Sequence, residues 1–264
     1  MAVVLAQAVG LLMASVLLLI SVEALPGTEA LGWSALAGIS GSLGLGCFYL
    51  ALSRGTMGLV APLTALLGAM IPAVVGLVRG EQVRPLVLAG MVVAVAAVVL
   101  ISMPDRRLGR PTLPTFHGSR GQEWLLIVGA GLGFGGFFLF IDASHDAGGA
   151  VWWPLFMVKL GGLSAIVVAG AVLVALGRRP IVALGPAALL MGCLAGAGDL
   201  GGNLFFVLAS AEGELSVVVV LSSLYPLGTA LLARLFLHER LGPLRVAGVG
   251  LAVTSVVLIG LGSL

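Results

Sequence analysis

The chain has 264 residues, of which 60% are hydrophobic and 9% are charged, and its formal net charge is +2. Soluble domains are about 45 to 50% apolar, so this composition excludes an ordinary soluble protein and indicates a membrane protein. The small positive charge is spread over several loops and forms no basic patch, which argues against nucleic acid as a partner.

Apolar runs of about 20 residues, the length of a helix that crosses ~30 Å of hydrocarbon, recur along the chain. They predict nine spans, at residues 2–22, 31–53, 57–78, 85–103, 124–141, 151–176, 185–208, 215–237 and 243–262. Runs of this length without a two-residue alternation favour helices over barrel strands. The predicted fold class is therefore all-α, a polytopic membrane protein.

The two halves of the chain resemble each other at an offset of 158 residues, where 36–101 aligns with 194–259 and about a third of the positions are identical. Glu81 aligns with Glu239, and Pro85 aligns with Pro243, matches that apolar composition alone does not produce. Five spans separate equivalent segments, and this odd number predicts that the halves are inverted. Inverted repeats are typical of secondary transporters, whose substrate site lies near the membrane midplane.

The spans divide into a first repeat at 1–103, a polar linker at 104–123 and a second repeat at 124–264. The first repeat has four spans and the second has five, where 5+5 is expected. Because the offset places Lys159 on Met1, we expect that the sequence begins one helix late.

Similar stretches precede the last span of each half: "RGEQVRP" at 79–85 and "LHERLGP" at 237–243. Together with Pro226, which lies thirteen residues before Glu239, they resemble EamA-type members of the drug/metabolite transporter superfamily. The resemblance covers the whole chain and is strongest over 185–262. It implies ten helices, no cofactor and a location in the plasma membrane.

The arginines follow the even-numbered spans more often than the odd-numbered ones. By the positive-inside rule this places the 104–123 linker and the "HER" stretch in the cytoplasm and the C-terminus outside. The resemblance instead implies that both ends are cytoplasmic, so the orientation stays open.

Three polar side chains inside predicted spans are candidate site residues: Lys159, Asp199 and Asn203. A charge at the bilayer centre costs roughly 2.5 to 3.5 kcal/mol on insertion scales, so each needs a reason. Asp199 lies ~20 Å along its span with Asn203 one turn further, and Lys159 lies ~12 Å along its own. The lysine would attract an anionic group, and the aspartate would bind an amine or carry a proton. The alternatives are a snorkelling lysine and an interhelical hydrogen-bond pair.

Phe206 shares a helix face with Asn203, and Tyr225 precedes Pro226, whose missing N–H frees a carbonyl in mid-helix. We expect the two aromatic residues to form the apolar wall of the site. Pro226 marks either a hinge or a simple packing kink.

The remaining motif residues, Glu81, Pro85, Glu239 and Pro243, are interpreted as structural. Proline is favoured at the first position of a helix, and a negative charge is favoured near its N-terminus. A solvated loop is the favoured interpretation of "DASHDAGG" at 142–149, and no metal or catalytic residue is predicted.

The function predicted is a secondary transporter, an exporter of a small metabolite such as an amino acid or related polar compound, working by alternating access. Its partners would be that substrate and the lipid bilayer, and Asp199 is the acid deep enough to serve proton or ion coupling. Two alternatives remain open at this stage: a membrane-embedded enzyme acting on a lipid-linked substrate, and a truncated remnant that does not transport. The oligomeric state is not predicted.

Overall fold

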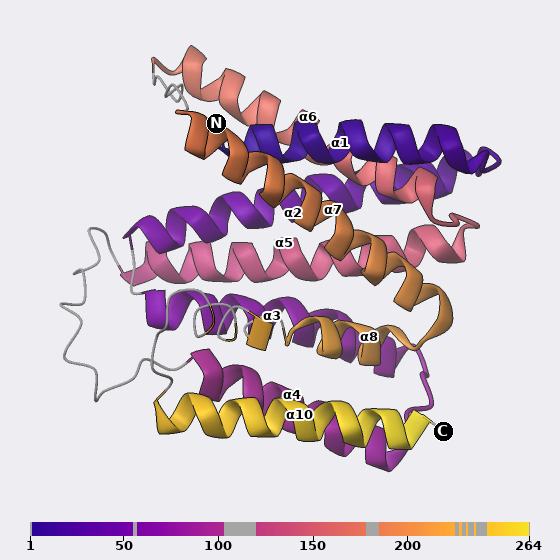
Figure 1. The fold of residues 1–264 in the computed structure, drawn as a ribbon, viewed down its shortest axis with the longest axis vertical. Coiled ribbons are helices and arrows are strands. Elements are labelled where there is room, and N and C mark those ends of the chain that lie inside the picture. Colours follow the sequence, from indigo (N-terminus) through magenta and orange to yellow (C-terminus); the bar gives the residue numbers. More distant parts are fainter. Residues whose placement is uncertain are drawn as a thin grey trace. The chain divides into compact units, whose positions relative to one another are not determined.

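The structure is a computed structural model that describes residues 2–54, 57–102, 120–177, 185–224, 227–228, 231, 235 and 242–263. Within these residues the chain forms helices and no strands, which confirms the predicted all-α class (Figure 1). The helices are α1 Ala2–Ser21, α2 Thr28–Arg54, α3 Met57–Val78, α4 Pro85–Ser102, α5 Arg120–Asp146, α6 Trp152–Ala175, α7 Pro186–Glu212, α8 Leu215–Ser222 and α10 Pro243–Ser263.

Helix α5 is longer than predicted and includes the acidic stretch that was expected to be a loop. Asp142, His145 and Asp146 lie in its last turns. The helix ends at Asp146, and the turn after it contains Gly148, which has a φ of 86° and donates its backbone N–H to the His145 carbonyl. Glycine adopts this left-handed conformation without a steric penalty, and it is the residue that most often stops a helix.

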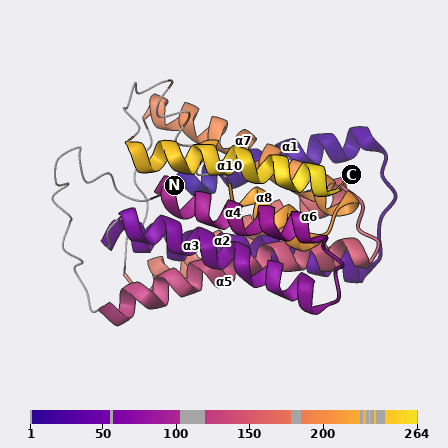
Figure 2. The same ribbon diagram turned by 90° about the horizontal axis from the view of Figure 1, so that it is seen from below.

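The chain forms two compact units: unit 1 contains Met1–Leu43 and Gly136–Glu212, and unit 2 contains Gly44–Gly135 and Gly213–Leu264. In unit 2, α4 and α10 lie side by side (Figures 1 and 2). In unit 1, α1 packs against both α6 and α7.

The helix bounds follow the offset found in the sequence. Helix α2 begins at Thr28 and α7 at Pro186, while α4 begins at Pro85 and α10 at Pro243, in both cases 158 residues apart. The two prolines therefore occupy the first helical position, as predicted.

Equivalent helices also pack on each other in opposite directions. A Cβ atom added to Gly90 of α4 would lie 2.7 Å from Cγ1 of Ile259, and one added to Gly248 of α10 would lie 2.8 Å from Cγ1 of Ile101. These contacts are the same contact seen from each repeat, because Gly90 corresponds to Gly248 and Ile101 to Ile259. Residues near the start of each helix therefore contact residues near the end of the other. Helices α4 and α10 thus run antiparallel, as an inverted repeat requires.

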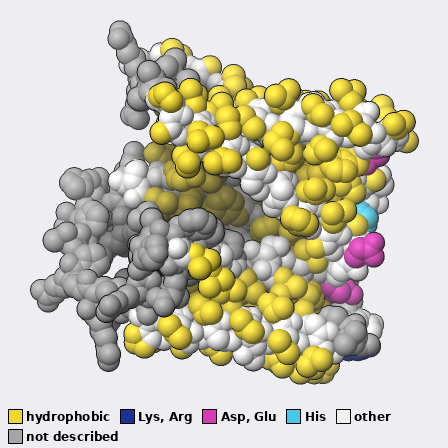
Figure 3. All heavy atoms as spheres, viewed as in Figure 1, with side chains coloured by type: hydrophobic (Ala, Val, Ile, Leu, Met, Phe, Trp, Pro, Cys, Tyr) yellow, Lys and Arg dark blue, Asp and Glu magenta, His cyan; other side chains and the backbone are white. Residues whose placement is uncertain are grey.

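Seven of the described helices are long and apolar enough to cross a membrane: α1, α2, α4, α5, α6, α7 and α10. Helix α3 contains a shorter apolar stretch at Leu63–Val78, and the predicted span at 215–237 continues beyond α8 into residues outside the described part. Hydrophobic side chains cover much of the described part of the face in Figure 3, and the acidic side chains visible there are few. The chain is thus a polytopic membrane protein.

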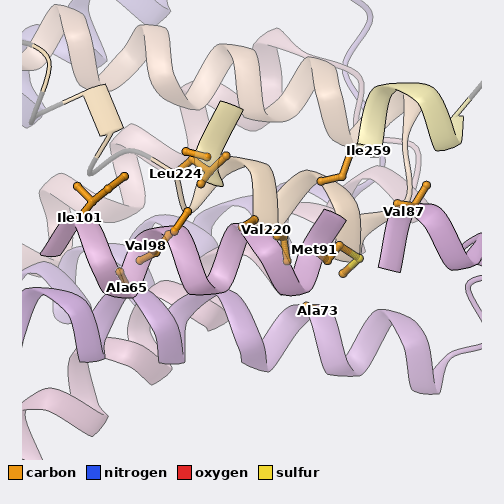
Figure 4. Close-up of a cluster of buried hydrophobic side chains, with 12 residues drawn as sticks. Ala65, Ala73, Val87, Met91, Val98, Ile101, Val220, Leu224 and Ile259 are labelled. Carbon is orange, nitrogen blue, oxygen red and sulfur yellow. The ribbon is translucent and has the colours of Figure 1, made fainter. Parts of the chain in front are cut away.

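The interior of unit 2 is an apolar cluster built by α3, α4, α8 and α10 (Figure 4). Small residues line the contact between α4 and α10, among them Ala94, Ala97 and Ala252, which are fully buried. Small side chains allow helix backbones to approach closely, and this packing stabilises helix pairs inside a membrane.

Candidate functional site

Lys159 and Asp199 form an ion pair in the interior of unit 1. The Nζ atom of Lys159 lies 2.5 Å from Oδ2 of Asp199. The lysine is on α6, roughly 10 Å from its start, and the aspartate is on α7, ~20 Å from its start, so the pair is deep in both helices. The structure thus brings together two residues that the sequence marked separately.

The two partners differ in exposure. The side chain of Lys159 is 1% exposed, whereas that of Asp199 is 47% exposed. The lysine therefore does not reach toward the headgroups, and the snorkelling alternative is wrong in this structure. A carboxylate accepts hydrogen bonds at both oxygens, so Asp199 can accept another donor while Lys159 holds it.

Glycines on neighbouring helices make room for the lysine side chain. A Cβ atom added to Gly10 of α1 would lie 3.1 Å from Cδ of Lys159 and 3.6 Å from the carbonyl oxygen of Gly196 on α7. A side chain at Gly196 would itself meet the backbone of Ala6 on α1. The long apolar stem of Lys159 thus lies where α1 approaches α7, and its ammonium group reaches Asp199.

Asn203 and Phe206 follow Asp199 along α7. Asn203 is half-buried, one turn beyond the aspartate. Phe206 is 5% exposed, and its ring centroid lies 4.6 Å from that of Phe138 and 6.0 Å from that of Phe137, both on α5. These contacts bury most of the Phe206 ring against α5, and its role as a wall for substrate stays a prediction.

The other predicted residues have separate positions. Tyr225, Pro226 and Glu239 lie outside the described residues. Glu81 lies between α3 and α4, and its Oε2 accepts a hydrogen bond of 3.1 Å from the backbone N–H of Ser216, in the first turn of α8. Glu81 therefore caps a helix of the other repeat, a structural role consistent with its interpretation as a motif residue.

The sequence did not indicate Gln7 of α1 as a site residue. Its Nε2 donates a hydrogen bond of 3.2 Å to Oγ of Ser42 on α2, and both side chains are buried. Its Oε1 is buried and has no hydrogen-bond partner among the described residues. The available signal was a glutamine inside the otherwise apolar run at 2–22, where a polar group requires a partner.

Glu23 was also missed, although it fixes the start of the helix that carries Lys159. Its carboxylate accepts hydrogen bonds from the backbone N–H groups of Val151, Trp152 and Trp153, at 3.2, 3.0 and 3.2 Å. In return, Nε1 of Trp153 donates to the Glu23 carbonyl oxygen at 3.2 Å. Three N–H groups that would otherwise lack intrahelical partners at the α6 N-terminus are satisfied in this way.

The fold and the buried ion pair define an all-helical integral membrane protein with a charged centre. Residues 122–261 match the model of the EamA-like transporter family. The match extends over more than half of the chain, so the chain belongs to the EamA-like transporter family, which is part of the drug/metabolite transporter superfamily.

None of the curated proteins compared with the chain matches it. A solved structure described only as "Crystal structure of protein" is similar, with a TM-score of 0.70 and 16% sequence identity. The similarity covers 98% of this chain and 88% of the other. At this identity the likeness shows a shared fold.

Family membership sets the class of function. The protein is a membrane transporter of the drug/metabolite type, and members of this family are transporters rather than enzymes. Its partners are a small-molecule substrate and the lipid bilayer, and the plasma membrane is the usual location of the family.

Proposed function

We propose that this protein exports a small zwitterionic metabolite, an amino acid or a related polar compound, and that the Lys159–Asp199 pair recognises its charged groups. The observation that carries the proposal is this ion pair, buried on the lysine side and half-exposed on the aspartate side. Ionisable residues inside membrane segments commonly mark a substrate or ion pathway.

Stability alone does not account for the pair. Replacing a buried ion pair with apolar residues of similar volume is often neutral or stabilising, so a protein that needs only packing can omit the charges. The internal repeat also indicates that the fold does not require these polar residues, because the positions equivalent to Asp199 and Asn203 in the first half are Gly41 and Leu45. The equivalent helix of the first half therefore forms without Asp199 and Asn203. Their presence in the second half supports a role in function rather than in folding.

A zwitterion suits this pair on electrostatic grounds. The ammonium group of the substrate would approach the half-exposed carboxylate of Asp199. The carboxylate of the substrate would approach the ammonium group of Lys159, which Asp199 releases. The Lys159–Asp199 site is neutral before the substrate binds and stays neutral afterwards, because the substrate carries no net charge. A singly charged substrate would leave a net charge in the hydrocarbon interior, where charge is costly.

Around the pair, Asn203 would bind polar groups of the substrate, and Phe206 and Tyr225 would provide an apolar wall. The repeats at 1–103 and 124–264 would move against each other to expose the site to one side of the membrane and then to the other. When the substrate leaves, Asp199 can take a proton, which offers a route to coupling.

The test is efflux from proteoliposomes loaded with a mixture of isotope-labelled amino acids. The wild type should release at least one of them, and Asp199→Asn should reduce that release to background. Gly202→Ala on the same helix is the matched control, because a Cβ atom there meets nothing within 4 Å. Efflux that survives Asp199→Asn would rule out the proposed role of the pair, and loading the labels outside instead of inside tests the direction.

A further inference from the structure

A second polar group lies one helical turn from the Lys159–Asp199 pair. Gln7 precedes Gly10 by three residues on α1, and Gly162 follows Lys159 by three residues on α6. A Cβ atom added to Gly162 would lie 3.2 Å from Nε2 of Gln7, while one added to Gly10 would lie 3.2 Å from Cε of Lys159. The lysine and the glutamine therefore occupy successive turns of the same contact between α1 and α6.

One end of the Gln7 amide has no partner among the described residues. Gln7 is 9% exposed, its Nε2 donates to Ser42 and its Oε1 is unpaired. Turning the amide over would pair the oxygen with the Ser42 hydroxyl, but an amide oxygen has two lone pairs, so it can accept a further donor in either orientation. A buried carbonyl without a hydrogen bond is destabilising, and its retention calls for a donor that reaches it in another state.

The Lys159 ammonium group is a donor within reach. Side chains three residues apart on a helix have Cβ atoms about 5–6 Å apart, so Gln7 begins one turn from the end of the lysine stem. Rotation about the lysine side-chain bonds moves the ammonium group over such a distance without moving the backbone. Gly10 lies beside this path. A Cβ atom there would lie 3.1 Å from Cδ of Lys159, so a larger residue would obstruct the rotation, whereas glycine does not.

We infer that Gln7 is a second binding position for the Lys159 ammonium group during transport. When the ammonium group of a substrate, or a proton, occupies Asp199, Lys159 turns to Oε1 of Gln7 and stays hydrogen-bonded. The lysine is then never unpaired within the membrane, which lowers the barrier to opening the ion pair. A neutral amide holds an ammonium group less strongly than a carboxylate does, so the lysine returns to Asp199 when the substrate leaves.

This inference rests on the proposed function. Two experiments distinguish a failure of the inference from a failure of the proposed function. The first relocates the acid: Gln7→Glu is combined with Asp199→Asn, and the matched control combines Ser15→Glu with Asp199→Asn. Ser15 lies eight residues after Gln7 on α1 and, at 3.6 residues per turn, about 140° around the helix from Gly10, away from the face that meets Lys159. The melting temperature of each purified double variant in detergent is measured.

We expect the Gln7→Glu double variant to melt above the Ser15→Glu double variant, because only the former provides a carboxylate for Lys159. Equal melting temperatures, or failure of both to accumulate in the membrane, would overturn the inference. This comparison does not use transport, so it holds even if the labelled amino acids are not the substrate.

The second experiment measures efflux of the labelled amino acids by Gln7→Leu. Loss of a hydrogen bond to a charged group should slow efflux on the order of 10- to 100-fold. The melting temperature should change little, since the variant removes an unpaired buried oxygen together with the hydrogen bond to Ser42. A glutamine that only supports the fold would give the opposite result, a lower melting temperature with efflux preserved, and that result would overturn the inference. If instead Asp199→Asn exports like the wild type, the proposed function fails first.

Discussion

Units 1 and 2 pack helices in different ways. In unit 2 the contact between α4 and α10 is apolar and lined by small residues such as Ala94 and Ala252. In unit 1 the contacts of α1, α6 and α7 also use glycines, but they enclose Lys159, Asp199 and the unpaired amide of Gln7. The same repeat therefore supports both an interface packed mainly by small apolar residues and one that encloses an ion pair, and this difference favours unit 1 as the place of the proposed transport chemistry.

The largest expected effect comes from removing one charge of unit 1. Asp199→Leu leaves the Lys159 ammonium group buried without a counter-charge, and breaking a buried pair in this way costs about 3–5 kcal/mol. The free energy of unfolding in detergent should fall by this amount, and efflux of labelled amino acids should fall to background.

The paired variant Lys159→Met with Asp199→Leu serves as the control, because it gives unit 1 the apolar interior of unit 2. Its free energy of unfolding should return to the wild-type value or exceed it, since no charge is left unpaired. Its efflux should remain at background. Wild-type efflux by this double variant would mean that the pair serves packing alone.

A loss of stability of similar size is expected at one of two phenylalanines that the repeat makes equivalent. Phe206 in unit 1 is buried against Phe138, whereas Phe48 in unit 2 is half-buried and lies 6.0 Å from Phe134. Phe206→Ala should lower the free energy of unfolding by about 3–5 kcal/mol, the range for a buried phenylalanine. Phe48→Ala should lower it less, because part of its surface is already exposed. Equal losses in chemical denaturation would show that the units are packed alike at these positions.

The sequence predicted the fold better than the site, for a physical reason. Hydrophobic runs and the 158-residue offset are local or periodic signals, so they predicted the helices and the starts of α4 and α10 at Pro85 and Pro243. Lys159 and Asp199 stood out because charge is rare inside a span, but their pairing links residues 40 apart on different helices. A single sequence carries no direct signal for such a contact.

Glu23 and Gln7 were missed for the same reason, because their contacts join residues that are far apart in the sequence. Glu23 binds backbone N–H groups 128 to 130 residues away, and any loop acid looks the same in sequence. Gln7 was visible as a polar residue in an apolar run, but its unpaired oxygen follows only from the packing of α1 against α2 and α6. The end of α5 was misplaced because the acidic residues 142–146 resemble a loop, whereas the conformation of Gly148 decides where the helix stops.

The apolar interface of unit 2 provides a test of the repeat itself. Gly90→Leu and Gly248→Leu each insert a side chain against both the side chain and the backbone of an isoleucine, Ile259 or Ile101. Overpacking of this kind costs about 1–3 kcal/mol, and the two losses should be similar because the contacts are equivalent. Gly250→Ala is the control, since a Cβ atom there meets nothing within 4 Å. Unequal losses in the free energy of unfolding would argue against equivalent packing of α4 and α10.

The smallest expected effect compares the two carboxylates that cap helices. Glu23 in unit 1 accepts hydrogen bonds from three backbone N–H groups at the start of α6, whereas within the described part of unit 2 Glu81 accepts one from the backbone N–H of Ser216 in α8. Loss of a helix cap costs about 0.5–2 kcal/mol, so Glu23→Ala should fall near the upper end of this range and Glu81→Ala near the lower end. Glu23→Gln should lie between Glu23→Ala and the wild type, because one amide oxygen can still accept. Denaturation in detergent measures all three, and an equal or larger loss for Glu81→Ala would show that the number of N–H groups bound does not set the strength of these caps.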